Sequence, residues 1–537
     1  MADLCLCASA EYKDRPAFSL FSADKICRQI TYSLMGSLAK QFSWALRHLG
    51  AGNGSRVMLL SENCPEWPVF YFGIALAGAV SVPVLTGFSF EQIEHIANQS
   101  GISAICLSRA ASQKFNNKNE MSVFSKIPFI YIDDMSNAHI SVSVNSVEKQ
   151  IKLNSFNEYI DHQQNPDDLA SIIYTSGTQG SSKGVMLSSR NLISSAVSTF
   201  SFIKINSSDR ALSVLPLAHS YECSLGLIVP VICGASITYL DKPPSASVLL
   251  PAMKLIRPTI IASVPLLMEK IYNSSIRPKL CANKLYGFPL TRRLVIWAAG
   301  RKLTKAMGGC IRFFGIGGAP LSSEVENFLY RIKFPYSIGY GLTEAAPLVA
   351  GNPPYCFSSK TGIVPPETVM IRIAETSSTL KSDEGEIQVK GPNVMMGYYN
   401  DKERTSEAFT ADGWLRTGDL GRIDKKGRLF IRGRLKALIL GPSGENIYPE
   451  EIEELLGSSQ LVEESLVYSG KKGELVAIVI LSEAAKTAAG VIENTLEDLR
   501  NWVNKKLAVF SRLSKIEIKY EPFEKTPTMK IKRYLYI

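Results

Sequence analysis

The stretch that decides the fold is Tyr174-Thr-Ser-Gly-Thr-Gln-Gly-Ser-Ser-Lys-Gly184. It follows an apolar run, Leu169–Tyr174, that is typical of a buried strand. It precedes a segment with apolar residues at helical spacing. Glycines let backbone N–H groups approach an anion closely, hydroxyls add hydrogen-bond donors, and Lys183 supplies positive charge. The pattern therefore predicts a loop that cradles phosphate.

This loop does not match the Walker A motif. Ser182 stands where that motif has Gly before the lysine, and Gly184 stands where it has Ser or Thr after it. A P-loop NTPase is therefore disfavoured. Taken alone, the loop could equally be a Ser/Gly-rich surface turn, so the rest of the chain must decide between the two.

Short β-branched runs alternate with helical patterns around this loop. Strands are expected at Arg56–Leu60, Ala79–Val84 and Ala104–Leu107, and a helix at Phe90–Ser100. The polar stretch Lys114–Lys152 is expected to be a surface excursion. The alternation predicts a layered α/β architecture.

The sequence pattern changes after about residue 380. Strand-and-turn patterns at Glu384–Gly391 and Gly427–Gly433 predict a small β-rich subdomain over about 360–433 that closes the large part. A compact α+β unit with an acidic first helix follows. We expect an N-terminal domain over 1–433 and a small mobile C-terminal domain over 434–537.

Composition and charge narrow the class of protein. The chain has 537 residues, 46% hydrophobic and 20% charged, which excludes a disordered or collagen-like protein. Its net charge of +10 favours acidic partners: nucleotides, phosphorylated carriers, nucleic acid or an anionic membrane. The apolar stretches Val69–Leu85 and Leu225–Ile237 fall short of the roughly 20 residues of a membrane span and are interpreted as buried core.

Cysteine and histidine usage indicates neither a disulfide framework nor a zinc site. The ten cysteines never form C-x-x-C, and the five histidines lack zinc-ligand spacing. The N-terminus lacks the basic region and the apolar run of a signal peptide. We expect reduced thiols and a cytoplasmic protein, with a peripheral position on the inner face of the membrane as an alternative.

Further motifs follow the phosphate loop in a fixed order. They are Leu215–Glu222, Gly317–Leu321, Tyr340–Glu344, Gly413–Asp419, Gly433–Lys436, Ser443–Glu453 and Lys525–Arg533. Together they resemble the adenylate-forming superfamily of acyl-CoA synthetases, luciferases and nonribosomal adenylation domains. The resemblance covers the chain from about residue 10 to the C-terminus. The motifs at 215–222, 264–272 and 526–533 are similar to those of bacterial long-chain fatty acid–CoA ligases and acyl–acyl carrier protein synthetases.

The resemblance implies a two-step reaction and assigns residues to it. A carboxylate is activated with ATP, pyrophosphate is released, and the acyl group passes to a thiol. Thr343 would contact the α-phosphate, and Glu344 would hold Mg²⁺, which prefers carboxylate and phosphate oxygens. The phosphates would be lined by Thr175, Ser176, Gly177, Thr178 and Lys183.

The residues that would bind the nucleoside are assigned in the same way. Tyr340 would stack on the adenine, and Gly341 beside it would belong to the cofactor-binding residues. Asp419 would accept the ribose hydroxyls, and Arg434 would contact ribose or phosphate. The opposite wall would be Gly317, Gly318 and Ala319.

The resemblance also assigns residues to catalysis and to domain movement. Lys530 would neutralise charge between the carboxylate and the α-phosphate during adenylation, and His219 would border the acyl site. Lys436 would be the hinge, and Gly444 would lie beside the pantetheine arm of CoA, where a Cβ would obstruct it.

Some positions depart from the family pattern. Gln179 and Ser182 replace the usual Thr and Pro of the phosphate loop. Ala437 replaces an acidic residue after the hinge, and Leu266 replaces an Arg of long-chain members. All the central catalytic residue types remain, so we expect an active enzyme.

The leading hypothesis is a ligase that uses ATP and Mg²⁺ to join a long-chain fatty acid to CoA. Transfer to the phosphopantetheine thiol of holo acyl carrier protein shares every motif and stays open. A non-catalytic nucleotide- or lipid-binding scaffold fits less well, and a nucleic-acid partner is not expected because no recognition module accompanies the charge. The last stretch of the chain, Arg500–Arg533, is strongly basic, which suits an acidic acceptor or an anionic membrane.

Overall fold

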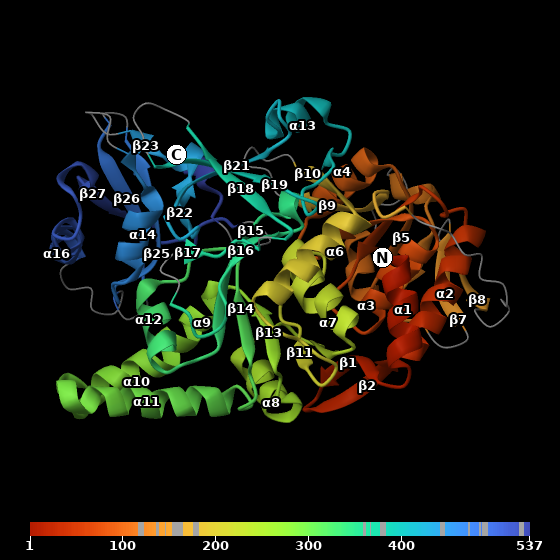
Figure 1. Ribbon diagram of the computed structural model, residues 1–537, viewed down its shortest axis with the longest axis horizontal. Coiled ribbons are helices and arrows are strands. Elements are labelled where there is room, and N and C mark those ends of the chain that lie inside the picture. The colour runs from red at the N-terminus through yellow and green to blue at the C-terminus, as the bar shows by residue number, and fades with distance from the viewer. Residues whose placement is uncertain are drawn as a thin grey trace.

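The structure is a computed structural model of the chain (Figure 1). It describes residues 1–115, 123–135, 139–144, 147–152, 165–175, 182–357, 361–365, 367–375, 383–440, 446–470, 473–482, 485, 492–525 and 531–536. Two large sheets with helices packed on them form most of the molecule. A smaller β-rich part lies between these sheets and the C-terminal elements, which are at the left of the view (Figure 1).

The first sheet carries the predicted phosphate loop between two of its strands. Strands β3, β4 and β5 are parallel and are joined by helices, as the alternating sequence pattern predicts. Over the described residues its strand order is β20 (Gly397–Tyr398), β10 (Lys183–Ser188), β9 (Leu169–Thr175), β4 (Val80–Val84), β3 (Arg56–Leu60), β5 (Ile102–Leu107), β6 (Phe129–Tyr131), β7 (His139–Val144) and β8 (Val147–Lys152).

Part of the polar stretch Lys114–Lys152 belongs to this sheet, which corrects the expectation of a surface excursion. Strands β6, β7 and β8 continue the sheet beyond β5, and Ile140 and Val142 on β7 are buried. The strands β7 and β8 pair antiparallel at the edge, where one face meets solvent. Edge strands of this kind carry many polar side chains, so their composition hides them.

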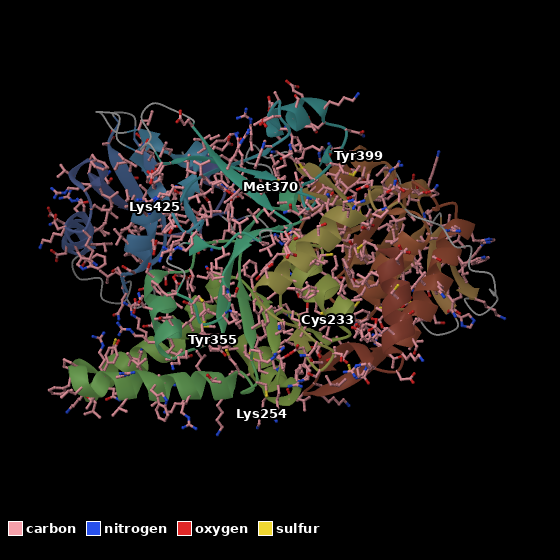
Figure 2. The ribbon with its side chains drawn as sticks, viewed as in Figure 1. Cys233, Lys254, Tyr355, Met370, Tyr399 and Lys425 are labelled. Atoms are coloured by element: carbon pink, nitrogen blue, oxygen red, sulfur yellow. The ribbon has the colours of Figure 1, made fainter. Side chains whose placement is uncertain are left out.

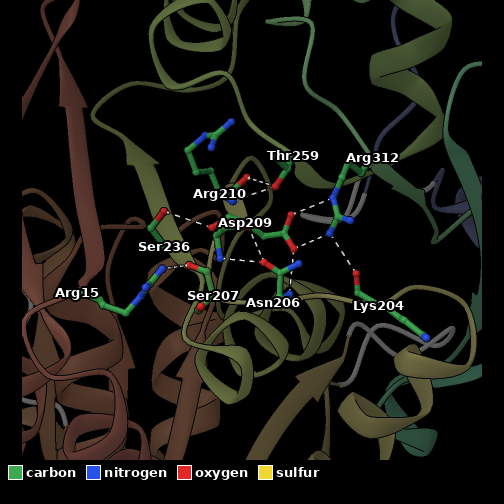
Figure 3. A network of polar contacts seen from close by, with 10 residues as sticks. Arg15, Lys204, Asn206, Ser207, Asp209, Arg210, Ser236, Thr259 and Arg312 are labelled. Carbon is green, nitrogen blue, oxygen red and sulfur yellow. Dashed lines mark hydrogen bonds and ion pairs between the residues drawn. The ribbon is translucent and has the colours of Figure 1, made fainter.

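The second sheet runs through the middle of the molecule (Figure 1). Asp209, just before β11, is 2% exposed and binds the guanidinium of Arg312 just before β14, with 2.6 Å between Oδ2 and Nη2 (Figure 3). This ion pair ties together two segments about a hundred residues apart. Among the described strands the order is β16 (Leu348–Gly351), β15 (Tyr336–Gly341), β14 (Phe313–Ile316), β13 (Ile260–Ser263), β11 (Arg210–Leu212), β12 (Ser236–Leu240), β1 (Pro16–Ser22) and β2 (Lys25–Thr31).

Helix α3 (Glu66–Leu76) is almost wholly apolar. All residues of α3 are buried, and Gly73 on α3 permits close approach to α2, because a Cβ there would lie 2.5 Å from a ring carbon of Phe42. The helices before the β-rich part are α1 (Ala2–Tyr12), α2 (Tyr32–His48), α3 (Glu66–Leu76), α4 (Phe90–Ser100), α5 (Arg109–Ser112), α6 (Ser189–Ser198), the π-helix η5 (Glu222–Ile228), α7 (Val229–Cys233), α8 (Ala246–Ile256), α9 (Pro265–Ile271), the π-helix η6 (Tyr272–Ile276), α10 (Arg277–Ala282), α11 (Pro289–Ala306) and α12 (Ser323–Arg331). The 3₁₀ turns there are η1 (Gln113–Phe115), η3 (Val123–Lys126), η4 (Thr199–Ser201), η7 (Lys284–Gly287) and η8 (Thr343–Ala345).

The strands predicted after residue 380 are present and belong to an antiparallel sheet. In the described part of the chain its order is β17 (Thr361–Gly362), β22 (Leu429–Arg434), β21 (Leu415–Ile423), β19 (Gly385–Lys390) and β18 (Met370–Ala374), with α13 (Lys402–Ala408) beside it.

The C-terminal elements have their own apolar cluster, which includes Ile452, Val479, Leu499 and Ile516. They comprise η9 (Leu435–Ala437), β23 (Ile439–Leu440), β24 (Asn446–Ile447), α14 (Pro449–Gly457), β25 (Val462–Ser469), β26 (Leu475–Leu481), α16 (Ile492–Asn504), η10 (Val509–Ser511), β27 (Lys515–Ile518) and η11 (Arg533–Leu535). The fold class is therefore as predicted, with a large α/β part and a small α+β part. The boundary at residue 434 stays a prediction.

Within the described residues, no helix is long and apolar enough to cross a membrane. The stretches Val69–Leu85 and Leu225–Ile237 lie largely in the interior, as expected from their sequence.

Candidate functional site

The two ends of the predicted phosphate loop meet in a hairpin. Thr175 at the end of β9 lies opposite Lys183 at the start of β10. Gly184 lies against Tyr174, because a Cβ there would be 3.0 Å from a carbon of its ring. The hairpin therefore brings Lys183 to the mouth of the loop, while Ser176, Gly177 and Thr178 lie outside the described residues.

Lys183 is linked to Glu344 through a tyrosine that sequence reasoning missed. The ammonium of Lys183 lies 4.9 Å from the centre of the Tyr398 ring, and the Tyr398 hydroxyl donates to Glu344 Oε1 at 2.9 Å. Burial and the Glu344 carboxylate both raise the pKa of Tyr398, so it remains a donor at neutral pH. Tyr398 lies on β20, which pairs with β10 across more than two hundred residues of sequence.

A second residue that sequence reasoning missed, Ser220, links the segment of His219 to Thr343. The hydroxyls of Ser220 and Thr343 are 3.3 Å apart. His219 accepts a hydrogen bond at Nδ1 from the backbone N–H of Tyr221 at 3.2 Å, which places the proton of the neutral ring on Nε2. The motif at 215–222 thus lies against the segment that carries Thr343 and Glu344.

A buried polar network holds this motif in place. The side-chain amide of Asn63 donates to Ser213 Oγ at 3.0 Å and to the Leu215 carbonyl at 2.6 Å, and it accepts from the Leu217 N–H at 2.9 Å. Ser213 in turn donates to Glu222 Oε1 at 2.6 Å. Glu222 is 1% exposed, and burial raises its pKa to about 8. At neutral pH the carboxyl is therefore mostly protonated.

The residues assigned to the nucleoside form a second cluster at the end of β15. The Tyr340 hydroxyl donates to Asp419 Oδ2 at 2.6 Å, and Arg434 Nε lies 2.8 Å from Asp419 Oδ1. Asp419 is 5% exposed, and its backbone N–H donates to Thr417 Oγ1 at 3.0 Å. Burial and Asp419 raise the pKa of Tyr340. The structure therefore places the three side chains as one hydrogen-bonded group.

The glycines beside this cluster are required by close approaches of the chain. A Cβ at Gly341 would lie 2.1 Å from the Pro347 carbonyl oxygen, and one at Gly317 would lie 3.2 Å from the Tyr221 ring. Gly318 has a φ of +86°, and both it and Ala319 are exposed. The loop after β14 therefore lies beside the segment that carries His219.

Two of the remaining predicted residues cannot be placed. Lys530 and Gly444 lie outside the described residues. Lys436 is exposed on η9, where the chain leaves the β-rich sheet. The assigned roles of these three stay predictions.

Glu344 is suited to a magnesium site that uses few protein ligands. Among the described residues, no group of three His, Cys, Asp or Glu side chains could hold a metal ion. Mg²⁺ commonly keeps several waters and binds one or two carboxylates together with substrate phosphates. A half-buried Glu344 near Lys183 fits that chemistry, because the lysine and the ion would bind the same phosphates.

Comparison with known proteins identifies the family of the chain. Residues 7–399 match the model of the AMP-binding enzyme family, described as "AMP-binding enzyme". The chain belongs to this family. The matched segment contains both strands of the phosphate hairpin, the motif at 215–222 and the Tyr340–Glu344 segment.

Relatives of this AMP-binding enzyme cover nearly its whole length. A peroxisomal long chain acyl-CoA synthetase 6 of Arabidopsis thaliana is 30% identical over 94% of this chain and 79% of its own. A chloroplastic long-chain-fatty-acid–[acyl-carrier-protein] ligase of the same plant is 28% identical over 95% and 81%. A 4-coumarate–CoA ligase 3 of Oryza sativa subsp. japonica is 27% identical over 99% and 91%.

A crystal structure supports the same fold. ATP-bound MatB from Rhodopseudomonas palustris superposes with a TM-score of 0.79 at 23% identity, covering 99% of this chain and 98% of that one. The AMP-binding enzyme therefore has the same overall fold as this ATP-bound protein.

Proposed function

We propose that the protein activates a long-chain fatty acid with ATP and transfers the acyl group to the thiol of CoA. The observation that carries the proposal is the chain of contacts from Lys183 through Tyr398 to Glu344, with Thr343 beside it. It places a cation, a carboxylate and hydroxyl donors from three distant segments at one place. Such a set suits a nucleoside triphosphate with its metal ion.

In the first step a carboxylate oxygen of the fatty acid bonds to the α-phosphorus, and the bond to pyrophosphate breaks. Lys183 would hold the phosphates and Thr343 would donate to the α-phosphate, so that negative charge in the transition state is stabilised. Glu344 would be the protein ligand of Mg²⁺, which when bound neutralises phosphate charge. Tyr398 would orient Glu344 through its hydroxyl.

The nucleoside would be held by the Tyr340–Asp419–Arg434 group. Both Asp419 oxygens are already engaged, one by Tyr340 and one by Arg434. A carboxylate offers about four acceptor positions, so Asp419 would accept ribose hydroxyls in addition to these two partners. The pre-formed contacts keep the acceptor in place before the nucleotide binds.

In the second step a thiol attacks the acyl carbon, AMP leaves, and the thiol loses its proton. We propose that the C-terminal part rotates between the steps and carries Lys530 to and from the site. Contacts that the rotation would break include Ser323 Oγ donating to Glu454 at 2.7 Å and Tyr448 donating to Glu384 at 3.0 Å. Lys436, on the segment between the two parts, would be the hinge.

The class of acid and the acceptor are tested together by product analysis. The protein is incubated with ATP, Mg²⁺ and palmitate, 4-coumarate or malonate, with either CoA or holo acyl carrier protein. We expect palmitoyl-CoA as the main product, because the relative at 30% identity is named a long chain acyl-CoA synthetase.

Other products would change the proposal in defined ways. A product with 4-coumarate and none with palmitate would refute the proposed acid. Palmitoyl–acyl carrier protein without palmitoyl-CoA would support the second candidate, which is favoured by the relative that is named an acyl-carrier-protein ligase. If the protein binds ATP but forms neither AMP nor an acyl product, it would be a non-catalytic scaffold.

A further inference from the structure

Residues 277–306 form an arm that extends from the body of the molecule. The arm comprises α10, η7 and α11, and Figure 1 shows it along the lower left edge, beneath the C-terminal elements. One side of α11 faces the body: Ile296, Gly300 and Leu303 are buried, and a Cβ at Gly300 would lie 2.6 Å from Ile332. This close contact fixes the orientation of the helix.

The outer side of the arm is apolar and exposed. Leu290, Leu294 and Trp297 follow one another at helical spacing and are 92%, 66% and 55% exposed. Phe288 at the turn before α11 is 63% exposed, and Leu285 is 53% exposed. Large apolar side chains gathered in this way mark an interaction surface, because isolated ones are normal but a contiguous group is not.

Positive charge surrounds this apolar group. Residues 277–306 contain eight Lys and Arg residues and no Asp or Glu. Arg301 and Lys305 continue the line of Leu290, Leu294 and Trp297 along the helix, and both are exposed. The guanidinium of Arg301 lies 4.9 Å from the centre of the Trp297 ring. The outer face is thus apolar toward the start of α11 and basic toward its end.

We propose that the arm, residues 277–306, docks the protein on an anionic lipid bilayer. A helix with Leu and Trp among Lys and Arg lies in the plane of the interface, its apolar side chains between the headgroups and its cations at the phosphates. A second copy of the chain is a poorer occupant, because two arms of eight like charges and no acids would repel each other. The proposed membrane contact therefore falls on the arm.

The arm is connected to the site of the proposed reaction. It follows α9 and η6 without a break, and α9 begins directly after Val264, whose side chain lies 3.9 Å from the position of a Cβ at Gly318. If the proposed function holds, a docked arm places that wall of the site close to a bilayer that contains the apolar substrate. The docking itself does not depend on the proposed function.

Vesicle flotation of the full-length protein tests the docking. One set of vesicles is phosphatidylcholine with about 30 mol% phosphatidylglycerol, and the other is phosphatidylcholine alone. We expect binding to the anionic set only, with a partition coefficient that falls as salt is added. Failure to bind the anionic vesicles at low salt, or equal binding to both sets, would overturn the proposal.

Variants of the arm assign the surface. Replacing Arg301→Gln and Lys305→Gln together should weaken partitioning about 25-fold. Each lost charge contributes about fivefold, which corresponds to about 1 kcal/mol. The matched control is Lys425→Gln with Lys426→Gln, an exposed pair in a distant turn (Lys425 is labelled in Figure 2). Equal binding by the arm variant and the control would refute the role of the arm.

The apolar half has its own variant and readout. The triple change Leu290→Ser, Leu294→Ser and Trp297→Ser should reduce partitioning at least tenfold. The control set Ile26→Ser, Val147→Ser and Met370→Ser, all exposed apolar residues elsewhere, should not reduce it. An unchanged thermal unfolding midpoint shows that each variant is folded, independently of any enzymatic activity.

Trp297 also reports docking directly. Its fluorescence should shift to the blue on anionic vesicles, and Trp297→Phe should abolish most of that shift although four other tryptophans remain. A shift that persists in Trp297→Phe would overturn the proposal. A second result would also overturn it: the wild type fails to bind vesicles, sediments as a dimer, and becomes a monomer in the triple variant. That result would assign the face to a second copy of the chain.

Discussion

Replacing Glu222 by Gln should remove a pH dependence of stability from the protein. The carboxyl is 1% exposed, accepts a hydrogen bond from Ser213 at 2.6 Å, and has its pKa raised by burial from 4.5 to about 8. Between these two pH values the native state holds a proton that the unfolded state has lost. The stabilisation is therefore complete below pH 4.5 and is lost as the pH rises through 8.

The magnitude follows from the linkage relation. Where only the native state is protonated, the free energy of unfolding falls by about 1.4 kcal/mol per pH unit, or about 2.7 kcal/mol over two units. Gln resembles the protonated acid in shape, and its carbonyl oxygen can still accept from Ser213. Burial also raises the pKa values of the neighbouring Tyr221, Cys223 and Tyr239, so these groups stay neutral over the same range.

Urea unfolding of wild type and Glu222→Gln at about pH 5.5 and about pH 7.5 checks this result. The stability of the Gln variant relative to wild type should rise by about 2.7 kcal/mol between the two conditions. Glu222→Ala is the control, because it should be destabilised at both pH values by the lost packing and the lost acceptor for Ser213. A pH-independent difference between wild type and Glu222→Gln would refute the account of a protonated, buried carboxyl.

Three further changes test the site. Tyr398→Phe removes the donor to Glu344 and should lower the adenylation kcat about tenfold or more. The control Tyr399→Phe should leave kcat unchanged, and equal rates for the two variants would exclude the positioning role of Tyr398. Asp419→Asn should raise the KM for ATP about 10- to 100-fold. The control is Asp412→Asn, in the turn before β21, which pairs with Arg372 of β18; an unchanged KM in Asp419→Asn would contradict the assignment. Lys530→Ala should lower the adenylation rate at least about 100-fold while thiolysis of preformed acyl-adenylate persists. The control Lys532→Ala should leave the rates of both steps unchanged. Equal loss of both steps in Lys530→Ala would exclude its assigned role.

The sequence was most informative where local patterns decide structure. The β-branched runs at 56–60 and 169–174 are strands, and the segment 90–100 is a helix with Ser89 and Gln92 forming its capping box. Such patterns can be recognised from a few consecutive residues, because they reflect which side chains of one strand or helix are buried. The roles of the phosphate loop, the segment at 340–344 and Asp419 were predicted because several motifs occur in order, and they stay predictions.

Residues that enter the site through distant pairings could not be predicted. Tyr398 reaches Glu344 because β20 pairs with β10, and nothing near Tyr398 in the sequence indicates that partner. Asn63 clamps Leu215 and Leu217 across about 150 residues. The polar composition of β7 and β8 concealed their membership in the sheet, since edge strands need few apolar residues.

The measurement that tests the central claim most directly is isotope exchange between pyrophosphate and ATP, without any thiol present. Exchange requires reversible formation of an acyl-adenylate, so it reports the first step alone. With Mg²⁺ and palmitate the account predicts rapid exchange that depends on both. The exchange should be largely lost in Lys183→Ala and, when ATP is below its raised KM, in Asp419→Asn. Folded protein that shows no palmitate-dependent exchange would contradict the account.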